Sequence, residues 1–220
     1  PGAASIRRIP TAPNSTGRRT ALASWITDPK NPLTTRVIVN RIWQYHFGRG
    51  LVTTSSDFGR LGSPPSHPEL LDWMTREFVE NGWSFKKLHR LIVTSATYQQ
   101  SALRDMPAIA AKIDPGNTLL WKMTSHRLAA EQIRDAALSV SGELNLKEGG
   151  TSEQSASSLR RTIYSRILRN SRDPLLDAFD APDALNSTPE RNSTTTATQS
   201  LLMINGPWML KRAEAFARRI

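Results

Sequence analysis

Residues 56–73, with the sequence SDFGRLGSPPSHPELLDW, bring acids, a histidine and arginine together in one short segment. A histidine near carboxylates can transfer protons or hold a metal ion, because its ring titrates near neutral pH and its nitrogens are good ligands. Asp57, His67 and Asp72 are therefore candidate ligand-binding residues. Asp57 and His67 flank the GSPPS sequence, which is expected to form a rigid loop.

The same segment also has a simpler explanation as the start of a helix. Ser66 and Glu69 have the spacing of a capping box, and Pro68 is tolerated in a first helical turn. His67 and Glu69 do not share a helical face. Helix capping is therefore the first interpretation, with proton transfer, ligand binding and a metal site as alternatives.

A second group of polar residues precedes this loop: Arg36, Asn40 and Arg41, together with Trp43. Arg36 and Asn40 are one helical turn apart, and Trp43 continues that face. Polar groups on an otherwise apolar helix are costly to bury without partners. We therefore expect them to bind the loop around Asp57, and the alternative is a pocket for an anion or a sugar.

A third group lies further along the chain. Glu131 is at helical spacing from both Arg127 and Arg134, and Asp135 follows Arg134 directly. A buried network of ion pairs between helices is the first interpretation. The alternative is a clamp in which Arg127 and Arg134 bind an anionic ligand through their forked guanidinium groups.

Other motifs give no further chemistry. The aspartates at 173, 177, 180 and 183 lack the spacing and the central glycine of a calcium loop. Helix capping explains the hydroxyl-rich RNSTTTATQ segment as well as an anion site does. The four histidines are scattered, and nothing matches a serine elbow, a P-loop, a dinucleotide fingerprint or a zincin helix. We assign no catalytic residue, no metal and no cofactor.

The composition is that of a globular protein with a positive charge. The 220 residues are 38% hydrophobic and 22% charged, and the formal net charge of +10 favours anionic partners. The sequence has no cysteine, which excludes disulfides and thiolate sites, and no apolar run of membrane-spanning length. It begins at Pro1 without an initiator Met, so we expect a piece of a longer or processed protein.

The apolar periodicity predicts a mainly α, irregular multi-helix domain with long ordered loops and at most a small β-hairpin. Residues 1–17 are expected to be an extended arm, and 18–220 a single helical domain with a flexible loop near 143–158. The segment RRTIYSRILRN, at 160–170, suits a strand or a helix. Six to eight helices are expected, over segments that include 18–28, 31–48, 66–80, 84–98, 125–142, 198–205 and 207–220.

Several helix ends and inner faces are predicted individually. Gly48 and Gly142 suit the positions just past two helix ends, and Ser84 suits an N-cap. Two helices are expected to turn apolar stripes toward the core, one made of Leu70, Trp73, Met74 and Phe78 and the other of Leu128, Ile133, Ala136, Ala137 and Val140.

Long blocks of the sequence resemble the DUF1553 domain family, also called PSD1, which is abundant in planctomycetes and related bacteria. The blocks are the whole of residues 31–102, DPGNTLLWKMTSHRLAAEQIRDAALSVSGEL at 114–144, RRTIYSRILRN, FDAPD and RNSTTTATQSLLMIN. The resemblance covers nearly the whole chain from about residue 20. It departs from the family pattern at 147–159, where a Ser-rich segment replaces a Gly/Pro-rich one.

The resemblance implies context more than chemistry. Such domains usually lie near the C-terminus of large exported proteins, at the cell surface or in the periplasm. They follow a DUF1549-like domain and often a cytochrome c-type haem domain, which are the neighbours implied here. This sequence has no C-x-x-C-H motif and does not attach that haem itself.

Three functions are therefore carried forward. The first is an accessory domain that binds a partner domain or an anionic ligand such as a polysaccharide. The second is a hydrolase-like or metal-assisted enzyme with a site at the 56–73 loop. The third is nucleic-acid binding, which needs a continuous basic face with exposed aromatic residues; the tryptophans at 25, 43, 73 and 83 are instead expected in the core.

Overall fold

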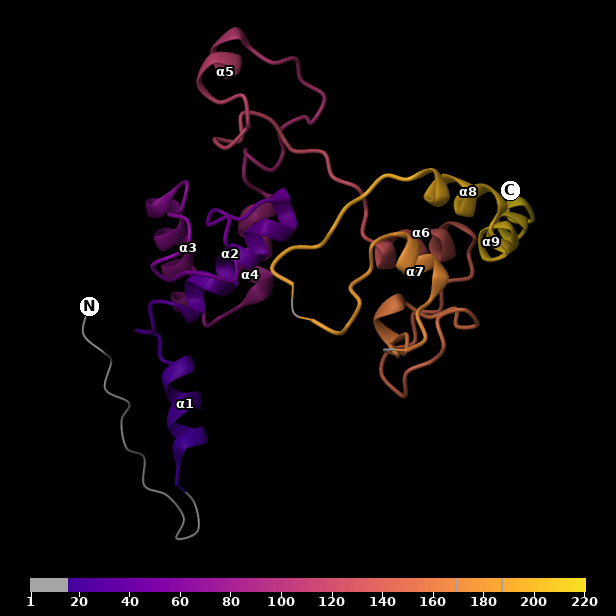
Figure 1. Cartoon of the computed structure of the whole chain (residues 1–220), viewed down its shortest axis with the longest axis horizontal. Coiled ribbons are helices and arrows are strands. Elements are labelled where there is room, and N and C mark those ends of the chain that lie inside the picture. Colours follow the sequence, from indigo (N-terminus) through magenta and orange to yellow (C-terminus); the bar gives the residue numbers. More distant parts are fainter. Residues whose placement is uncertain (1–15, 169, 187) are drawn as a thin grey trace. The chain divides into compact units, whose positions relative to one another are not determined.

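The computed structural model describes residues 16–168, 170–186 and 188–220. The chain is mainly helical, as predicted, and forms two compact units (Figure 1). Unit 1 ends at Ser125, and unit 2 runs from His126 to Ile220. Within the described part of the chain, no helix is both long and apolar enough to span a membrane.

Unit 1 is built around three helices that pack on one another, α2, α3 and α4. A first helix, α1, buries none of its residues, and a short α5 lies in the long segment that follows α4. The bounds are α1 Arg18–Ile26, α2 Thr34–Phe47, α3 Pro68–Glu80, α4 Phe85–Val93 and α5 Ala108–Ile113.

Unit 2 combines helices with long irregular segments. Its β structure, in the described residues, is limited to isolated bridges such as the one between Asn145 and Arg160. The segment RRTIYSRILRN contains a short 3₁₀ turn, η1, in place of a regular strand or helix. The bounds are α6 Ala130–Val140, η1 Thr162–Tyr164, α7 Pro174–Ala178, α8 Ala197–Asn205 and α9 Pro207–Ala217.

The described residues therefore form nine α-helices, where six to eight were expected. The short α7 lies in a turn-rich segment, whereas α5 is formed by the alanine-rich sequence AIAAKI, which favours helix. Asp173 explains α7, because its carboxylate accepts hydrogen bonds from the backbone N–H groups of Leu175 and Leu176. A good N-cap and Pro174 at the first position allow even a single turn of helix here.

The core of unit 1 lies between α2, α3 and α4. Its buried side chains are Val39, Ile42, Trp43, Phe47, Leu51, Val52, Leu71, Met74, Phe78, Leu88 and Ile92. The predicted inner stripe of α3 is right for Met74 and Phe78 but wrong for Trp73, which is 42% exposed. Leu71 is buried in its place, because Leu71, Met74 and Phe78 share one face of the helix and Trp73 lies beside it.

Two of the predicted helix ends in this unit are confirmed and one is wrong. Gly48 follows α2 in the left-handed conformation, and the Ser84 hydroxyl accepts a hydrogen bond from the N–H of Lys87. The capping box of Ser66 and Glu69 does not form. The residue before α3 is His67, without a side-chain cap, and the Ser66 hydroxyl instead bonds the His67 ring at 2.9 Å.

A buried amide side chain fastens the loop after α2. Asn40 is fully buried, and its side chain binds both backbone groups of Val52, donating to the carbonyl at 3.0 Å and accepting from the N–H at 2.8 Å. Gly50 allows this close approach, since a Cβ there would lie 2.8 Å from the Asn40 amide nitrogen. Asn40 thereby supplies the loop with the pairing that a neighbouring strand supplies elsewhere.

The core of unit 2 is smaller and brings α6 and α7 together. It consists of Ala130, Leu175, Leu176 and Phe179. The predicted inner face of α6 is wrong at both ends, because Leu128 is 51% and Val140 is 53% exposed. The helix begins at Ala130, so Leu128 lies outside it, and the buried positions are instead Ala130, Arg134 and Leu138.

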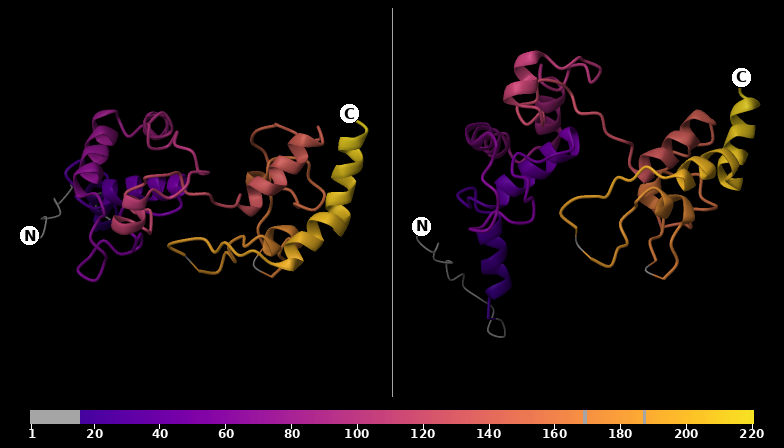
Figure 2. Two further views of the ribbon diagram at one scale, coloured as in Figure 1. Left: turned by 90° about the horizontal axis from the view of Figure 1, so that it is seen from above. Right: turned by 45° about the horizontal axis from the view of Figure 1, so that its top comes forward.

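Two helices end the chain, as predicted, and they meet at a bend visible in both views of Figure 2. Gly206 separates α8 from α9, and Pro207 begins α9. A Cβ at Gly206 would lie 2.3 Å from the Leu202 carbonyl oxygen, closer than real atoms approach. The bend therefore requires glycine at this position because of crowding.

The loop near 143–158, whose flexibility stays a prediction, accepts hydrogen bonds from a buried arginine. Arg160 is 4% exposed and donates hydrogen bonds to the carbonyls of Lys147, Gly149 and Thr151. It also pairs with the carboxylate of Glu153 at 3.2 Å. The Ser-rich composition predicts flexibility because it gives no sign of a guanidinium arriving from outside the loop.

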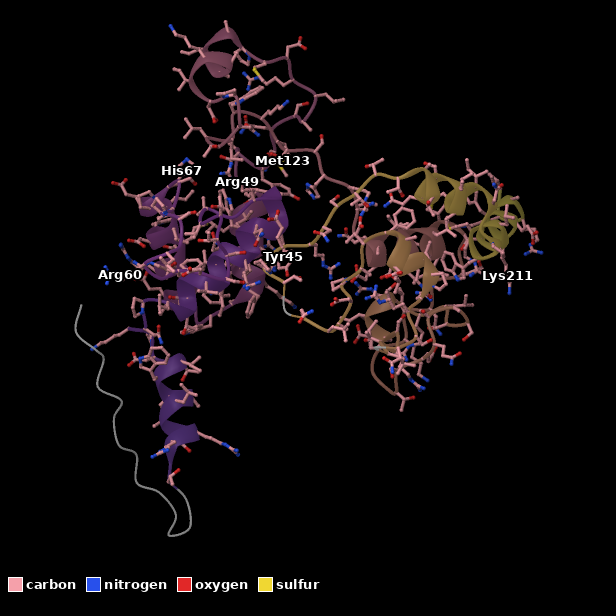
Figure 3. All side chains as sticks on the ribbon, in the orientation of Figure 1. Tyr45, Arg49, Arg60, His67, Met123 and Lys211 are labelled. Carbon is pink, nitrogen blue, oxygen red and sulfur yellow. The ribbon has the colours of Figure 1, made fainter. Side chains whose placement is uncertain are left out.

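We expect Asn40→Ala to lower the free energy of unfolding by about 2–4 kcal/mol, because it leaves the buried N–H and C=O of Val52 without partners. Chemical denaturation followed by circular dichroism measures the loss. Tyr45→Ala is the control, since Tyr45 lies on the same helix and is 72% exposed (Figure 3), and a change within about 0.5 kcal/mol is expected. Equal stability of the two variants would show that Asn40 does not fasten the loop.

Candidate functional site

The structure joins two of the sequence-predicted residues of unit 1 in one ion pair. Arg36, on α2, donates from Nε and from a terminal nitrogen to one carboxylate oxygen of Asp72, on α3, at 2.8 and 2.6 Å. It also donates to the Pro32 carbonyl at 2.9 Å. The pair is partly solvated, with side chains 34% and 50% exposed.

This ion pair lies in the wall of a cavity of about 420 Å³. Most of the lining is apolar, and the polar side chains are those of Arg36, Ser63 and Asp72. The cavity lies between the start of α2, the loop before α3 and the start of α3. Its lining residues are Pro32, Leu33, Arg36, Val52, Phe58, Gly59, Gly62, Ser63, Pro64, Pro65, Leu71 and Asp72.

The loop that forms one wall of the cavity is held by its own polar groups. The Asp57 carboxylate accepts from the N–H of Gly59 at 2.8 Å, and the Thr54 hydroxyl donates to the Asp57 carbonyl and accepts from the N–H of Ser63. A Cβ at Gly62 would lie 2.2 Å from the Asp57 carbonyl oxygen. Asp57 therefore acts as a turn residue that shapes the wall.

The remaining predicted residues of unit 1 have separate partners. Arg41 donates to the Ser56 hydroxyl at 3.2 Å. Trp43 is 7% exposed and stacks on Phe47 in the core. His67 bonds its neighbour Ser66 at the start of α3. Asp57, His67 and Asp72 thus serve a turn, a helix start and an ion pair, respectively.

In unit 2, Arg127 is one part of a network that holds the segment before α8. It pairs with the Asp180 carboxylate at 2.6 Å and donates to the carbonyls of Phe179 and Thr194. The N–H and hydroxyl of Thr194 also donate to Asp180. These bonds hold the pKa of Asp180 below its usual value, the backbone N–H of Thr194 being the largest cause.

Both terminal nitrogens of Arg134 are bound by the protein itself, whereas its buried Nε has no hydrogen-bond partner among the described residues. It is 1% exposed, and its guanidinium donates to the backbone carbonyls of Ser155, Ser158 and Arg160. Glu131 was expected to pair with Arg127 and Arg134, but in the structure it pairs with Arg191 at 2.7 Å. Local spacing could not reveal this, since Arg191 is 60 residues away along the chain.

The aspartates that follow η1 are likewise capping and pairing residues. Asp173 caps α7, Asp177 pairs with Arg172 at 2.6 Å, and Asp183 accepts from the N–H groups of Leu185 and Asn186. Thr196 caps α8, in agreement with the capping interpretation of RNSTTTATQ. Over the described ranges, no three His, Asp or Glu side chains gather as metal ligands would.

Two of the histidines that lie scattered in the sequence meet in the structure and join α2 to α4. Nε2 of His46 and Nδ1 of His89 lie 2.8 Å apart, and Tyr98 meets the His46 ring edge-on. Burial, and secondarily repulsion from His89, lowers the pKa of His46. No sequence signal links the two, because 43 residues separate them.

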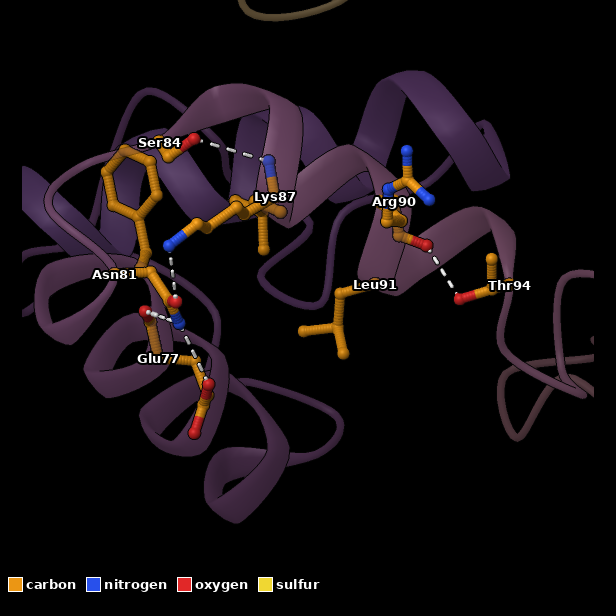
Figure 4. Close-up of a pocket in the computed structure, with 9 residues that line it drawn as sticks. Glu77, Asn81, Ser84, Lys87, Arg90, Leu91 and Thr94 are labelled. Atoms are coloured by element: carbon orange, nitrogen blue, oxygen red, sulfur yellow. Dashed lines mark hydrogen bonds between the residues drawn. The ribbon is translucent and has the colours of Figure 1, made fainter.

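A second cavity, of about 320 Å³, lies in a groove between α3 and α4 (Figure 4). Phe78, Leu88 and Leu91 contribute its apolar lining, and Lys87 and Arg90 line it from α4. Lys87 donates to the Asn81 side-chain oxygen at 3.2 Å, and the Asn81 amide donates to Glu77. The groove was not singled out from the sequence, because its cations come from an ordinary amphipathic helix.

These features define a mainly helical protein whose long loops are held by buried polar side chains. Open cavities of about 420 and 320 Å³ lie in unit 1, and one of about 350 Å³ lies in unit 2. The PSD1 family, described as a protein of unknown function (DUF1553), matches residues 18–220. The chain therefore belongs to the PSD1 (DUF1553) family, as its sequence blocks predicted. Comparison with curated proteins and with solved structures found no match.

We expect Arg134→Met to destabilise unit 2 by at least about 3 kcal/mol, because three buried carbonyls lose a charged donor. Hydrogen exchange measures this locally, and the backbone amides of 155–165 should exchange faster than in the wild type. Lys211→Met, on the exposed face of α9 (Figure 3), is the control with the same loss of charge. Unchanged exchange in Arg134→Met would show that the guanidinium does not hold the loop.

The His46–His89 pair predicts an acid-sensitive unit 1. Because the folded protein lowers the pKa of His46, the unfolded chain binds the proton more readily. The stabilisation is therefore complete above the ordinary pKa of about 6.5 and is lost as the pH falls below it. The melting temperature of the wild type should fall between about pH 6.5 and 5 more steeply than that of His46→Gln; parallel curves would contradict this.

Proposed function

We propose that the chain is an accessory binding domain that holds an anionic ligand, such as an acidic polysaccharide, through unit 1. The supporting observation is the way in which the two units use their basic residues. Among the described residues, seven arginines of unit 2 pair with acids of the same unit, whereas most cations of unit 1 are exposed and make no ion pair. The proposal thus assigns the two units different tasks.

The charge is unevenly divided along the sequence. Sixteen basic and eight acidic residues precede His126, and 13 basic and 11 acidic residues follow Ser125, giving net charges of +8 and +2. Among the described residues, one ion pair lies in unit 1 and seven lie in unit 2. An unpaired surplus of this kind attracts polyanions over distances comparable to the Debye length.

Helix α4 concentrates this surplus. Lys86, Lys87, His89 and Arg90 are exposed and fall within about half of the helix circumference, and we call them the α4 face. Leu88 and Ile92 anchor the opposite side in the core, and α4 contains no acidic residue. The side chains of Lys86 and Arg90 make no ion pair within the described part of the chain, so they are available to a ligand.

A groove lies beside the cations of α4 and provides a surface on which a ligand can lie. Lys87 and Arg90 border both the groove and the α4 face, and Glu77, the acid that lines the groove, bonds Asn81. An anionic chain lying along α4 would contact Phe85, which is 52% exposed, as well as the cations. Such a combination of cations and apolar surface suits a sugar polymer with acidic groups.

We also propose that this domain works as one part of a larger exported protein, at the cell surface or in the periplasm. Its neighbours there would be a DUF1549-like domain and a cytochrome c-type domain. The family resemblance supports this placement, because other members have that arrangement. Immunoblotting of cell fractions with an antibody to the domain tests it, and recovery in the cytoplasm alone would overturn it.

Charge reversal on α4 tests the binding proposal. We expect Lys86→Glu together with Arg90→Glu to weaken binding of dextran sulfate at least about tenfold, and to reduce the slope of log affinity against log salt by about two. Calorimetry at several salt concentrations gives both quantities. Uncharged dextran is the ligand control and should not bind to the α4 face.

The matched protein control is Lys211→Glu together with Arg218→Glu, which makes the same change in net charge on exposed residues of unit 2. Binding should change less than about twofold in this variant. Equal loss in both variants would mean that overall charge, rather than the α4 face, attracts the polymer. Single-stranded DNA is a second probe, and tighter binding of DNA than of dextran sulfate at equal salt would favour nucleic-acid binding.

A further inference from the structure

We propose that the cavity beside the Arg36–Asp72 ion pair is a second binding site, specific for a neutral hydroxylated ring such as one pyranose unit of a polysaccharide. This site lies between α2, the loop before α3 and α3, and it does not include the α4 face. The proposal rests on the hydrogen-bonding capacity of the ion pair, on its net charge and on the apolar walls around it.

The ion pair leaves both donors and acceptors without partners among the described residues. Both bonds from Arg36 go to the same oxygen of Asp72, so the second carboxylate oxygen has no partner among the described residues. A guanidinium has five N–H donors, and those to Asp72 and to the Pro32 carbonyl account for three. One free acceptor thus lies beside two free donors.

This arrangement selects by charge as well as by hydrogen bonding. Arg36 and Asp72 neutralise each other, so an anion entering the cavity would gain from the guanidinium but be repelled by the carboxylate. A sugar hydroxyl both donates and accepts, and can therefore satisfy the two groups together without adding charge. The ion pair accordingly favours neutral hydroxyl groups over carboxylates, sulfates or cations.

A sugar ring has apolar C–H faces as well as hydroxyl groups, and the apolar walls of the cavity suit these faces. Leu33, Phe58, Pro64 and Pro65 contribute rigid or apolar surface to the lining. The volume of about 420 Å³ falls within the range of small-molecule sites. An apolar enclosure with a few convergent polar groups is the usual form of such a site.

The loop is also shaped before any ligand arrives. Asn40 fastens Val52, Thr54 joins the two ends of the turn at Asp57 and Ser63, and the Ser66 N–H donates to the Leu51 carbonyl at 2.8 Å. Binding therefore needs little ordering of the backbone, which lowers its entropic cost. Asn40 and Asp57, which drew attention in the sequence, serve this shape instead of contacting the ligand themselves.

Saturation-transfer NMR with methyl pyranosides of glucose, galactose and mannose tests the proposal. We expect at least one of them to bind the wild type and to lose at least about tenfold in affinity in Leu33→Trp, whose ring fills the cavity. Leu61→Trp is the control, because Leu61 is 93% exposed and does not line the cavity. Thermal melts establish that both variants fold.

A second variant tests the role of charge. Asp72→Asn removes the carboxylate and leaves Arg36 as an unpaired cation, so the neutral sugar should bind more weakly and methyl glucuronide more tightly than to the wild type. The proposal would be overturned if no pyranoside showed saturation transfer, or if the pyranoside bound equally well to Leu33→Trp. It would also be overturned if the wild type bound methyl glucuronide, or toluene as a purely apolar probe, more tightly than the neutral sugar.

The two sites are tested separately. Lys86→Glu with Arg90→Glu should leave the binding of the neutral pyranoside unchanged, because neither residue lines the cavity. Leu33→Trp should leave the binding of dextran sulfate unchanged, because Leu33 is not part of the α4 face. Loss of pyranoside binding in the α4 variant would place the sugar at the α4 face and overturn the second site, whatever the result with dextran sulfate.

Discussion

Backbone groups that leave water must find hydrogen-bond partners, and in this protein side chains provide many of them. The described chain has long loops and only isolated β-bridges, so no sheet is present to pair the loop backbone. Asn40 performs this task in unit 1, and Arg134 and Arg160 perform it in unit 2. The loops can remain ordered without becoming strands because these three side chains are buried among them.

This dependence explains why the two units treat their arginines differently. In unit 2 a small apolar core is supplemented by guanidinium groups, each of which binds several carbonyls at once. Unit 1 has the larger core and needs few such bonds. Its basic side chains are accordingly available at the surface, where their charge acts on the surroundings instead of on the fold.

Features set by neighbours in the sequence were predictable, and features set by distant residues were not. The cap at Ser84 and the glycine at 48 follow from a few adjacent residues. Ser66 had the same local signal but a different outcome, because its N–H is fixed on the Leu51 carbonyl and the helix begins at Pro68. Of the candidate site residues, Arg36 and Asp72 do meet, but Arg134 points to carbonyls more than 20 residues away, which no periodicity encodes.

The glycines at 62 and 206 carry a consequence for comparing relatives of this chain. A Cβ at Gly62 would lie 2.2 Å from the Asp57 carbonyl oxygen, and one at Gly206 would lie 2.3 Å from the Leu202 carbonyl oxygen. Any other residue at these positions would therefore force the backbone apart. Homologues should therefore retain glycine at both positions whatever they bind. Invariance at Gly62 would then record steric crowding, and variation at Leu33 or Phe58 would be the better guide to a change of ligand.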